Sequence, residues 1–128
     1  MISIHLHSAT PVVNQITAEI KRAIARGDLR PGEPLPPVRQ LAGDLGIHWN
    51  TVARAYRDLA ADGYLTVVRG RGAMVSPRKQ WPDRISEVRE SILGKIRNLI
   101  AEGTLGGLEI EELKDLFYAE LGKWQERG

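Results

Sequence analysis

Apolar side chains recur at intervals of three or four residues along several stretches of the chain, a spacing that predicts amphipathic helices. The first stretch follows a Thr10-Pro11 pair, where we expect Thr10 to cap a helix and Pro11 to occupy its first position. Its apolar stripe consists of Val13, Ile16, Ile20, Ala23 and Ile24. Gly27 fits the left-handed residue that ends such a helix.

The segments on either side of this helix have other patterns. Residues 1–7 alternate apolar and polar side chains, which predicts a short strand whose apolar face holds Ile2, Ile4 and Leu6. Residues 28–37 contain four prolines and a glycine and therefore cannot be helical. We expect a tight loop there, anchored to the core by Leu29 and Leu35.

Two further helices are predicted close together in the middle of the chain. One spans about residues 37–45 and stops at Gly46, and the other spans about residues 48–62 and stops at Gly63. Ala42 provides a small residue where the two helices would cross, and Gly46 permits the positive φ of a tight turn. The positions that would fill the shared core are all apolar, namely Leu41, Leu45, Ile47, Val52, Ala55, Tyr56 and Leu59. This register predicts a helix-turn-helix.

The second helix of this pair has a polar face opposite its apolar stripe. With Val52 and Leu59 turned toward the core, the helical period turns Asn50, Arg54 and Arg57 outward. Asparagine can pair with adenine and arginine with guanine or phosphate, so this face suits the major groove of DNA.

Two side chains near this face have structural alternatives. Arg54 could instead form a surface pair with Asp58, four residues later on the same helix. Trp49 could pack at the helix start instead of contacting nucleic acid. The free N–H groups at residues 48–51 would attract a phosphate in either case.

A β-hairpin is predicted directly after the helix-turn-helix. Residues 64–68 and 72–75 are two short β-prone runs, and no acidic residue occurs within residues 66–78. A basic hairpin tip can reach backbone phosphates or the minor groove. By itself such a tip is better explained as a solvated basic turn, but next to a helix-turn-helix it is typical of a DNA-binding wing. Its residues are Arg69, Gly70 and Arg71.

The last part of the chain predicts two helices, at about residues 83–102 and 109–125, after a linker at residues 78–82. Two helices cannot bury this much apolar surface against each other alone. We expect homodimerisation, because a two-fold dimer matches a palindromic operator; an intramolecular helical cap is the alternative. The residues expected at the dimer interface are Ile85, Val88, Ile92, Ile96, Leu99, Leu113, Leu116 and Phe117.

Composition and charge narrow the class of protein. The chain has 128 residues, 42% hydrophobic and 27% charged, which is typical of a globular protein. The net charge is only +2, but residues 1–80 carry 11 Lys and Arg against 6 Asp and Glu, whereas residues 81–128 carry 7 against 10. This asymmetry indicates a polyanion-binding front half. The absence of cysteine excludes disulfides and cysteine-based metal sites, and we expect a cytoplasmic protein.

The sequence resembles the GntR family of bacterial transcriptional regulators. The residues that carry the resemblance are PVVNQITAEIKRAI, GDLRPGEPLPPVRQLAGDLGI, NTVARAYRDLAADGYL and GRGAMV, which run almost without a gap from Pro11 to Val75. The short back end and the residues from Asn50 to Tyr56 are similar to the YtrA-type subfamily, which pairs a winged helix with a two-helix dimerisation region. Because 128 residues are too few for it, we do not expect the aminotransferase-like domain of the MocR-type branch.

The resemblance also implies a set of DNA contacts. In this sequence they fall on Arg39, His48, Trp49, Asn50, Thr51, Arg69 and Gly70. The sequence departs from the family pattern in three places. Pro37 replaces a capping serine, His48-Trp49 replaces Asn-Pro and so removes an obvious cap, and Ala53 replaces an arginine that touches DNA. Arg54 or Arg57 could compensate for that lost arginine.

The sequence thus predicts a mainly α fold with a small β-hairpin, a winged helix-turn-helix at residues 1–77 followed by a two-helix dimerisation region at residues 83–128. The predicted function is a dimeric, sequence-specific DNA-binding regulator, most simply a repressor, that binds double-stranded operator DNA. We expect no enzymatic activity, no cofactor, no membrane association and no conventional effector domain.

Two alternatives remain open at this point. A winged helix can serve as a protein-interaction module without specific DNA binding. His5 and His7, on one face of the expected strand, could accept a transition metal as part of a metal-dependent switch or enzyme, although no third ligand is identifiable.

Overall fold

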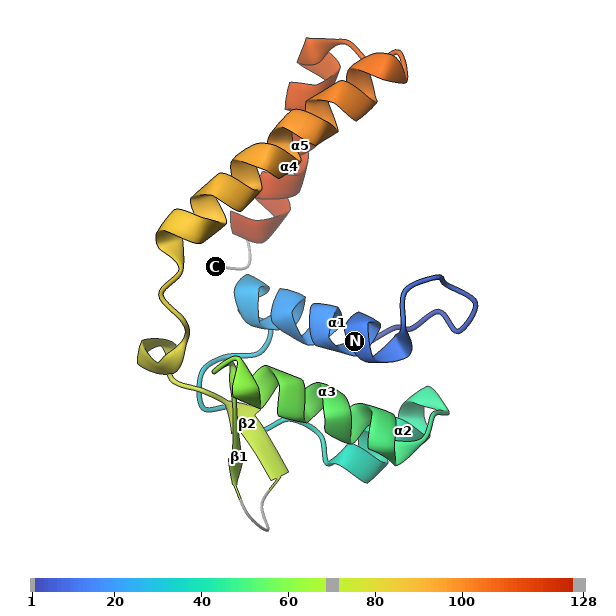
Figure 1. The fold of residues 1–128 in the computed structure, drawn as a ribbon, viewed down its shortest axis with the longest axis vertical. Coiled ribbons are helices and arrows are strands. Elements are labelled where there is room, and N and C mark those ends of the chain that lie inside the picture. The colour runs from blue at the N-terminus through green and yellow to red at the C-terminus, as the bar shows by residue number, and fades with distance from the viewer. Residues whose placement is uncertain (1, 69–71, 126–128) are drawn as a thin grey trace. The chain divides into compact units, whose positions relative to one another are not determined.

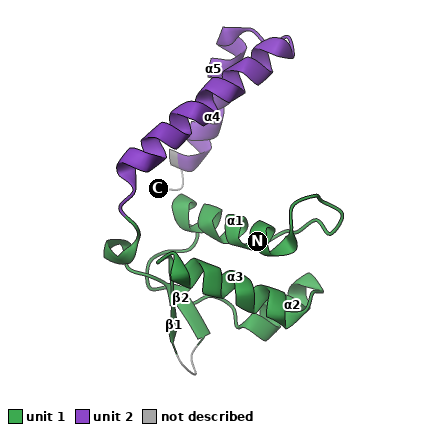
Figure 2. Cartoon of the chain, viewed as in Figure 1, with its two compact units in different colours: residues 1–82 green, residues 83–128 purple. Residues whose placement is uncertain are grey.

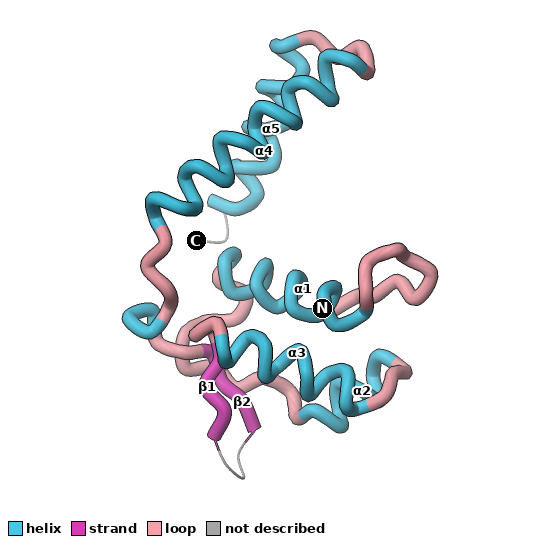
Figure 3. The backbone as a smooth tube through the Cα atoms, in the orientation of Figure 1, coloured by secondary structure: helices cyan, strands magenta, loops and turns pink. Residues whose placement is uncertain are grey.

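The computed structural model describes residues 2–68 and 72–125. The chain divides into two compact units, residues 1–82 and residues 83–128 (Figure 2). The described parts are mostly helical, and they contain one two-stranded antiparallel hairpin (Figure 3). This is the mainly α fold with a small hairpin that the apolar periodicity predicts.

Three helices form the body of the first unit, and their bounds follow the expected pattern closely. They are α1 (Val12–Arg26), α2 (Val38–Leu45) and α3 (Trp49–Ala61), and both α1 and α2 pack against α3 (Figure 1). Ile16 and Ile20 of α1 and Leu59 of α3 are fully buried between them. The loop anchors Leu29 and Leu35 are each 6% exposed, as predicted.

The start of α1 differs from the expectation by one residue. Pro11 is the N-cap and makes no side-chain capping bond, so the prediction that Thr10 is the cap is wrong. The backbone of Thr10 is instead hydrogen-bonded to neighbouring side chains. Gln15 Nε2 donates to the carbonyl oxygen of Thr10 at 2.8 Å, and the N–H of Thr10 donates to Ser8 Oγ at 3.1 Å, which gives the chain a turn before the helix.

The predicted strand at residues 1–7 is also absent among the described residues, since residues 2–5 are irregular and a turn follows. The side-chain amide of Gln15 satisfies the backbone of His5, accepting from its N–H and donating to its carbonyl oxygen at 3.0 Å. A helix side chain therefore takes the place of a neighbouring strand. Ile2 and Ile4 still pack on the core, whereas Leu6 is 64% exposed.

The hairpin consists of β1 (Leu65–Val68) and β2 (Gly72–Val75), paired antiparallel from Leu65 opposite Val75 to Val68 opposite Gly72. The proline-rich loop adds a partial third strand, which the sequence does not predict. Gly32 N and Leu35 N donate to carbonyl oxygens of β2 at 2.8 Å each. Val75 N donates to the carbonyl oxygen of Glu33 at 2.9 Å, but Glu33 N bonds to Arg30 O instead of β2, and the pairing is a single bridge between Pro34 and Met74.

Residues 78–82, the expected linker, belong to the first unit and pack on the winged helix. They contain a short 3₁₀ helix, η1 (Arg78–Gln80). Trp81 Nε1 donates to the carbonyl oxygen of buried Ser76 at 3.0 Å, and its ring lies 6.3 Å from that of Tyr64. The segment is thereby held to the end of the hairpin.

The second unit consists of α4 (Ile85–Leu105) and α5 (Ile110–Gln125), joined by a short turn and packed against each other. At their connected end Leu113 lies against Gly103, where a Cβ would be 2.6 Å from Leu113 Cδ2. No side chain of α4 is buried. The two helices therefore leave a large apolar surface uncovered within this unit.

Candidate nucleic-acid interface

The helix-turn-helix is built by the residues that the sequence singles out. Ala42, 3% exposed, occupies the crossing of α2 and α3. Gly46 adopts φ +69°, and Ile47 N donates to the carbonyl oxygen of Ala42 at 3.0 Å, which reverses the chain in a tight turn. Val52 and Ala55 are completely buried. The apolar positions therefore fix how α3 is presented to solvent.

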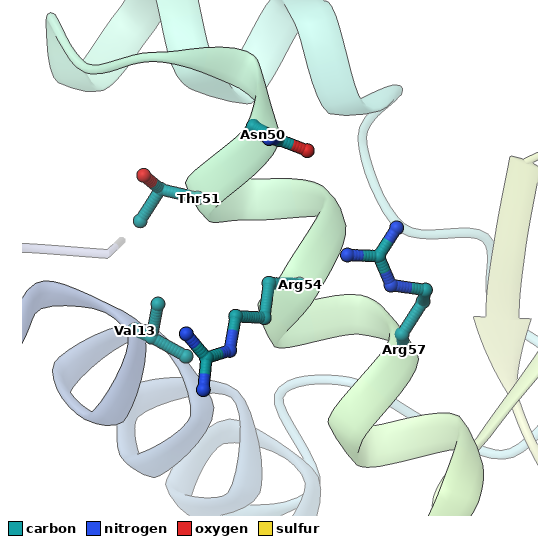
Figure 4. A pocket seen from close by; sticks show the side chains of 5 residues that line it. All are labelled: Val13, Asn50, Thr51, Arg54 and Arg57. Carbon is teal, nitrogen blue, oxygen red and sulfur yellow. The ribbon is translucent and has the colours of Figure 1, made fainter.

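The outward face of α3 carries the polar residues that were predicted there. Asn50, Arg54 and Arg57 are exposed and Thr51 is half-buried. In Figure 4, Thr51 and Arg54 reach toward the side where α1 presents Val13, while Asn50 and Arg57 lie on the other side.

These four polar residues and Val13 line a shallow hollow of about 200 Å³. Val13 is a contribution that sequence reasoning missed, because its spacing marked it only as a member of the core stripe of α1.

Arg54 keeps its charge available. Among the described residues no ion pair joins Arg54 to Asp58, so the surface-pair alternative is wrong for this structure. Arg57 is likewise without a carboxylate partner in the described part of the chain. Two guanidiniums and one amide on a single helix face can recognise phosphates or base edges.

His48 is the N-cap of α3, and its Nδ1 accepts a hydrogen bond from the N–H of Asn50 at 3.1 Å. The expectation that His48-Trp49 removes the cap is therefore wrong. A neutral imidazole has one nitrogen lone pair in the plane of the ring, and here it satisfies a donor that the helix leaves free.

Arg39 and Trp49 lie together across the turn. The Cζ of Arg39, on α2, is 5.2 Å from the centroid of the Trp49 ring, and the ring of His48 is stacked 5.5 Å from Trp49 at 29°. Trp49 is 42% exposed. Trp49 therefore lies at the surface in contact with Arg39 and His48 and is not packed in the core. Spacing along the sequence does not indicate the contact with Arg39.

The predicted contacts of the wing, Arg69, Gly70 and Arg71, lie outside the described residues. The structure does define the strands that lead to them. The hairpin and α2 lie at opposite ends of α3 (Figure 1). Thr66 Oγ1 and Ser76 Oγ are 2.8 Å apart at the base of the hairpin.

Tyr56 connects α3 to the proline-rich loop. Its hydroxyl donates to the carbonyl oxygen of Pro36 at 2.7 Å. The side chain is only 4% exposed, and burial raises its pKa to about 12. Tyr56 therefore stays neutral at physiological pH and acts as a structural donor.

The metal alternative gains no support. Within the described parts of the chain, no group of three or more His, Asp or Glu residues is arranged to hold a metal ion. His5 and His7 are both exposed and do not share a strand face. Among the same residues no helix is long and apolar enough to cross a membrane.

The residues predicted at a dimer interface fall into two groups. Five of them line an apolar groove of about 440 Å³ between α4 and α5, namely Ile92, Ile96, Leu99, Leu113 and Phe117. Ile85, Val88 and Leu116 are exposed but lie outside that groove. The groove also contains Ile100 and Ile110, which belong to the same apolar periodicity, and two lysines, Lys95 and Lys114, which do not.

Comparison with known proteins identifies relatives of this architecture. The sequence model of the family described as bacterial regulatory proteins, gntR family, matches residues 12–75. The HTH-type transcriptional repressor YtrA of Bacillus subtilis is 32% identical over 115 residues, which cover 90% of this chain and 88% of YtrA. The HTH-type pyridoxine biosynthesis transcriptional regulator PdxR of Corynebacterium glutamicum is 42% identical over 76 residues; these cover 59% of this chain but only 17% of PdxR.

Solved structures agree with the sequence matches. YtrA from Sulfolobus acidocaldarius, a GntR-family transcription factor, superposes with a TM-score of 0.60 at 34% identity, covering 75% of this chain and 97% of that one. The DNA-binding domain of AraR in complex with operator ORX1 superposes with a TM-score of 0.53 at 28% identity, covering 58% of this chain and 92% of that one. The chain therefore belongs to the GntR family of bacterial regulatory proteins, and within it to the YtrA type.

Proposed function

We propose that this protein is a transcriptional repressor that binds a palindromic DNA operator as a homodimer. The observation that carries the proposal is the outward face of α3, where Asn50, Arg54 and Arg57 are exposed opposite the fully buried Val52 and Leu59. A helix presented in this way fits the major groove, where an amide can pair with adenine and a guanidinium with guanine.

The contacts divide into two kinds. Asn50 and Arg57 are proposed to reach base edges. Thr51 and Arg54, on the side facing α1, are proposed to hold the phosphate backbone. The positive end of the helix dipole at the start of α3 also favours a phosphate. The AraR domain, a structural neighbour seen with its operator, supports this use of the fold.

Homodimerisation is proposed to occur through the second unit. The apolar groove between α4 and α5 is an uncovered surface on this unit, and Ile85, Val88 and Leu116 add exposed apolar side chains outside it. Such a surface is typical of an interface between subunits. Two copies would present two α3 helices to half-sites about one helical turn apart or a multiple of that distance. Bound there, the dimer would block transcription.

Binding of the full chain to duplexes selected from a random-sequence pool tests this proposal. We expect affinity for the selected duplex to fall with salt at a log–log slope of about −5 to −9, which corresponds to about 6–10 neutralised phosphates. A random duplex should bind about 10³-fold more weakly or worse. Affinity that is insensitive to salt, or equal for both duplexes, would favour a protein-interaction module instead.

Substitutions on α3 locate the interface. Arg57→Ala should relax base preference at one position of the selected site, at a cost of about 1–3 kcal/mol. Arg54→Ala should weaken binding to all sequences and reduce the salt slope by about 1. Arg97→Ala, on α4, removes the same charge from the other unit and serves as the control. Equal losses in all three variants would show that net charge, not the α3 face, determines binding.

A further inference from the structure

Three side chains form a continuous stack across the turn of the helix-turn-helix. Arg39 lies in the first turn of α2 with its Cζ 5.2 Å from the centroid of the Trp49 ring. Trp49 is the first residue of α3 and stacks on His48. His48 is itself held by the hydrogen bond from Asn50 N to its Nδ1. Helix α3 thus anchors one end of the stack, and the guanidinium is at the other.

The indole ring restricts Arg39 without neutralising it. Arginine side chains have high rotamer freedom, and an exposed one must lose that freedom when it binds a phosphate. A carboxylate partner would order the guanidinium but would occupy its donors and cancel its charge. Trp49 offers the aromatic face that holds a cation best, and it leaves the N–H groups free. Among the described residues no ion pair involves Arg39.

Resting on the proposed function, we infer that Trp49 is a positioning residue for DNA binding. Its ring holds the guanidinium of Arg39 beside the start of α3, ready to donate to a phosphate oxygen, and Trp49 itself contributes no base contact. The 42% exposure of Trp49 follows from this role, since a ring buried in the core could not serve as a platform at the surface. Both residues would then contribute to affinity as a single unit.

A double-mutant cycle on the full chain tests this inference, with a fluorescent duplex selected from a random-sequence pool by the wild-type protein as the probe. Arg39→Ala should weaken binding about 10-fold, as the loss of one charge-assisted hydrogen bond does. Trp49→Ala should weaken it about two- to fivefold, the range of an exposed cation–π contact. In the Arg39→Ala background, Trp49→Ala should cause no further loss.

Two readouts separate positioning from ordinary packing. Trp49→Ala should reduce the salt slope although it removes no charge, because Arg39 then engages its phosphate less often. Trp49→Phe should restore part of the affinity, whereas Trp49→Leu, which keeps apolar bulk but has no π face, should not. All variants should unfold at nearly the wild-type temperature.

Additive losses in the cycle would overturn the inference and indicate that Trp49 contacts DNA directly. Full rescue by Leu would show that bulk suffices and would also overturn it. A wild-type chain that selects no duplex would overturn the proposed function itself, a result distinct from additivity. If the Trp49 variants unfold, NMR of the wild type tests the stack instead, through the ring-current shift that Trp49 causes at the Arg39 side-chain N–H. It should be present in the wild type without DNA, and its absence would contradict the stack.

Discussion

At the scale of single residues, His48 shows how an uncommon side chain can replace a common cap. Ser, Thr, Asp and Asn are preferred at N-caps because a short side-chain oxygen reaches the N–H groups of the first turn. Here Nδ1 of an imidazole makes the same bond to Asn50 N at 3.1 Å. The bond fixes the ring on which Trp49 stacks. Stability and the placement of the Trp49 ring therefore depend on the same atom.

We predict that His48→Ala lowers the free energy of unfolding by about 1 kcal/mol, because the N–H of Asn50 loses its acceptor. His48→Asn keeps a capping oxygen and should cost much less. Urea denaturation of both variants measures the difference. Equal destabilisation by Ala and Asn would mean that the stacking of the imidazole, and not its capping bond, stabilises this helix start.

We predict that the folded chain loses stability at alkaline pH because Tyr56 is buried. Burial raises its pKa in the folded chain to about 12, above the ordinary value of 10.0. The contribution of Tyr56 to the free energy of unfolding is fully present below pH 10, where its hydroxyl is protonated in both the folded and the unfolded chain. It is lost as pH rises toward 12, because the unfolded chain releases the proton first. Up to about 2–3 kcal/mol of unfolding free energy should be lost across this window.

Tyr56→Phe isolates this effect from the titration of other groups. The variant loses the hydrogen bond to Pro36 O, so it should be less stable by about 1 kcal/mol at neutral pH. Between pH 10 and 12 its stability should decline less steeply than that of the wild type. Parallel declines, measured by denaturant titration at each pH, would show that Tyr56 ionises equally in the folded and unfolded chain.

At the scale of elements, glycines with positive φ end the helices of the winged helix, but their surroundings differ. Gly46 after α2 adopts φ +69° and has open space where a Cβ would stand. Gly63 after α3 adopts φ +91°, and a Cβ there would lie 2.8 Å from the carbonyl oxygen of Gln80. The second glycine therefore permits two things at once, the turn into β1 and the close approach of η1.

We predict that Gly46→Ala costs about 1 kcal/mol, the strain of a left-handed conformation alone. Gly63→Ala should cost more than about 2 kcal/mol, because the strain adds to a clash with backbone that cannot move aside cheaply. Chemical denaturation of the two variants gives the comparison. Similar losses at both sites would mean that residues 78–82 shift without cost, as a loosely attached linker would.

At the scale of the whole molecule, the two units bury their apolar residues very differently. The first unit has a continuous core, in which Ile16, Val52 and Val75 are fully buried. The second has large apolar side chains that remain exposed, from Leu93 at 38% to Leu105 at 89%. A pair of helices cannot surround its own apolar residues, so this unit is expected to need a partner surface.

We predict that the combined substitutions Ile96→Glu and Phe117→Glu, both in the groove between α4 and α5, convert a dimer into a monomer of about 14.2 kDa. Charged groups placed in an apolar interface lose hydration without gaining partners. Affinity for the selected duplex should then fall about 100-fold or more, because the two half-sites are no longer bound together. Multi-angle light scattering and anisotropy titrations measure the two effects.

Leu105→Glu is the matched control for this experiment. Leu105 is 89% exposed on α4 and does not line the groove, so the same change of charge there should leave the dimer intact. A monomeric wild type at micromolar concentration would contradict the dimer proposal. Dissociation by Leu105→Glu as well would show that added negative charge, not the groove, controls assembly.

The predictability of the fold and the site follows from how local each determinant is. The ends of α1, α2 and α3 are predictable because glycine is needed where φ is positive, at Gly27, Gly46 and Gly63. The outward position of Asn50 and Arg57 follows from the helical period once Val52 is assigned inward. The cap at His48 was not predictable from residue preference, because a bond to Nδ1 depends on the rotamer of a single ring.

The sequence by itself determined the α-helices and the hairpin, their order and the face that each helix of the winged helix turns to solvent, because periodicity and turn residues act over a few neighbouring positions. Only the tertiary structure decided the contacts between distant segments. Gln15 replaces a strand partner for His5, Gly32 and Leu35 pair with β2, and Arg39 meets Trp49 across the turn. Each of these depends on where two folded elements come to lie in space, which no spacing along the chain records.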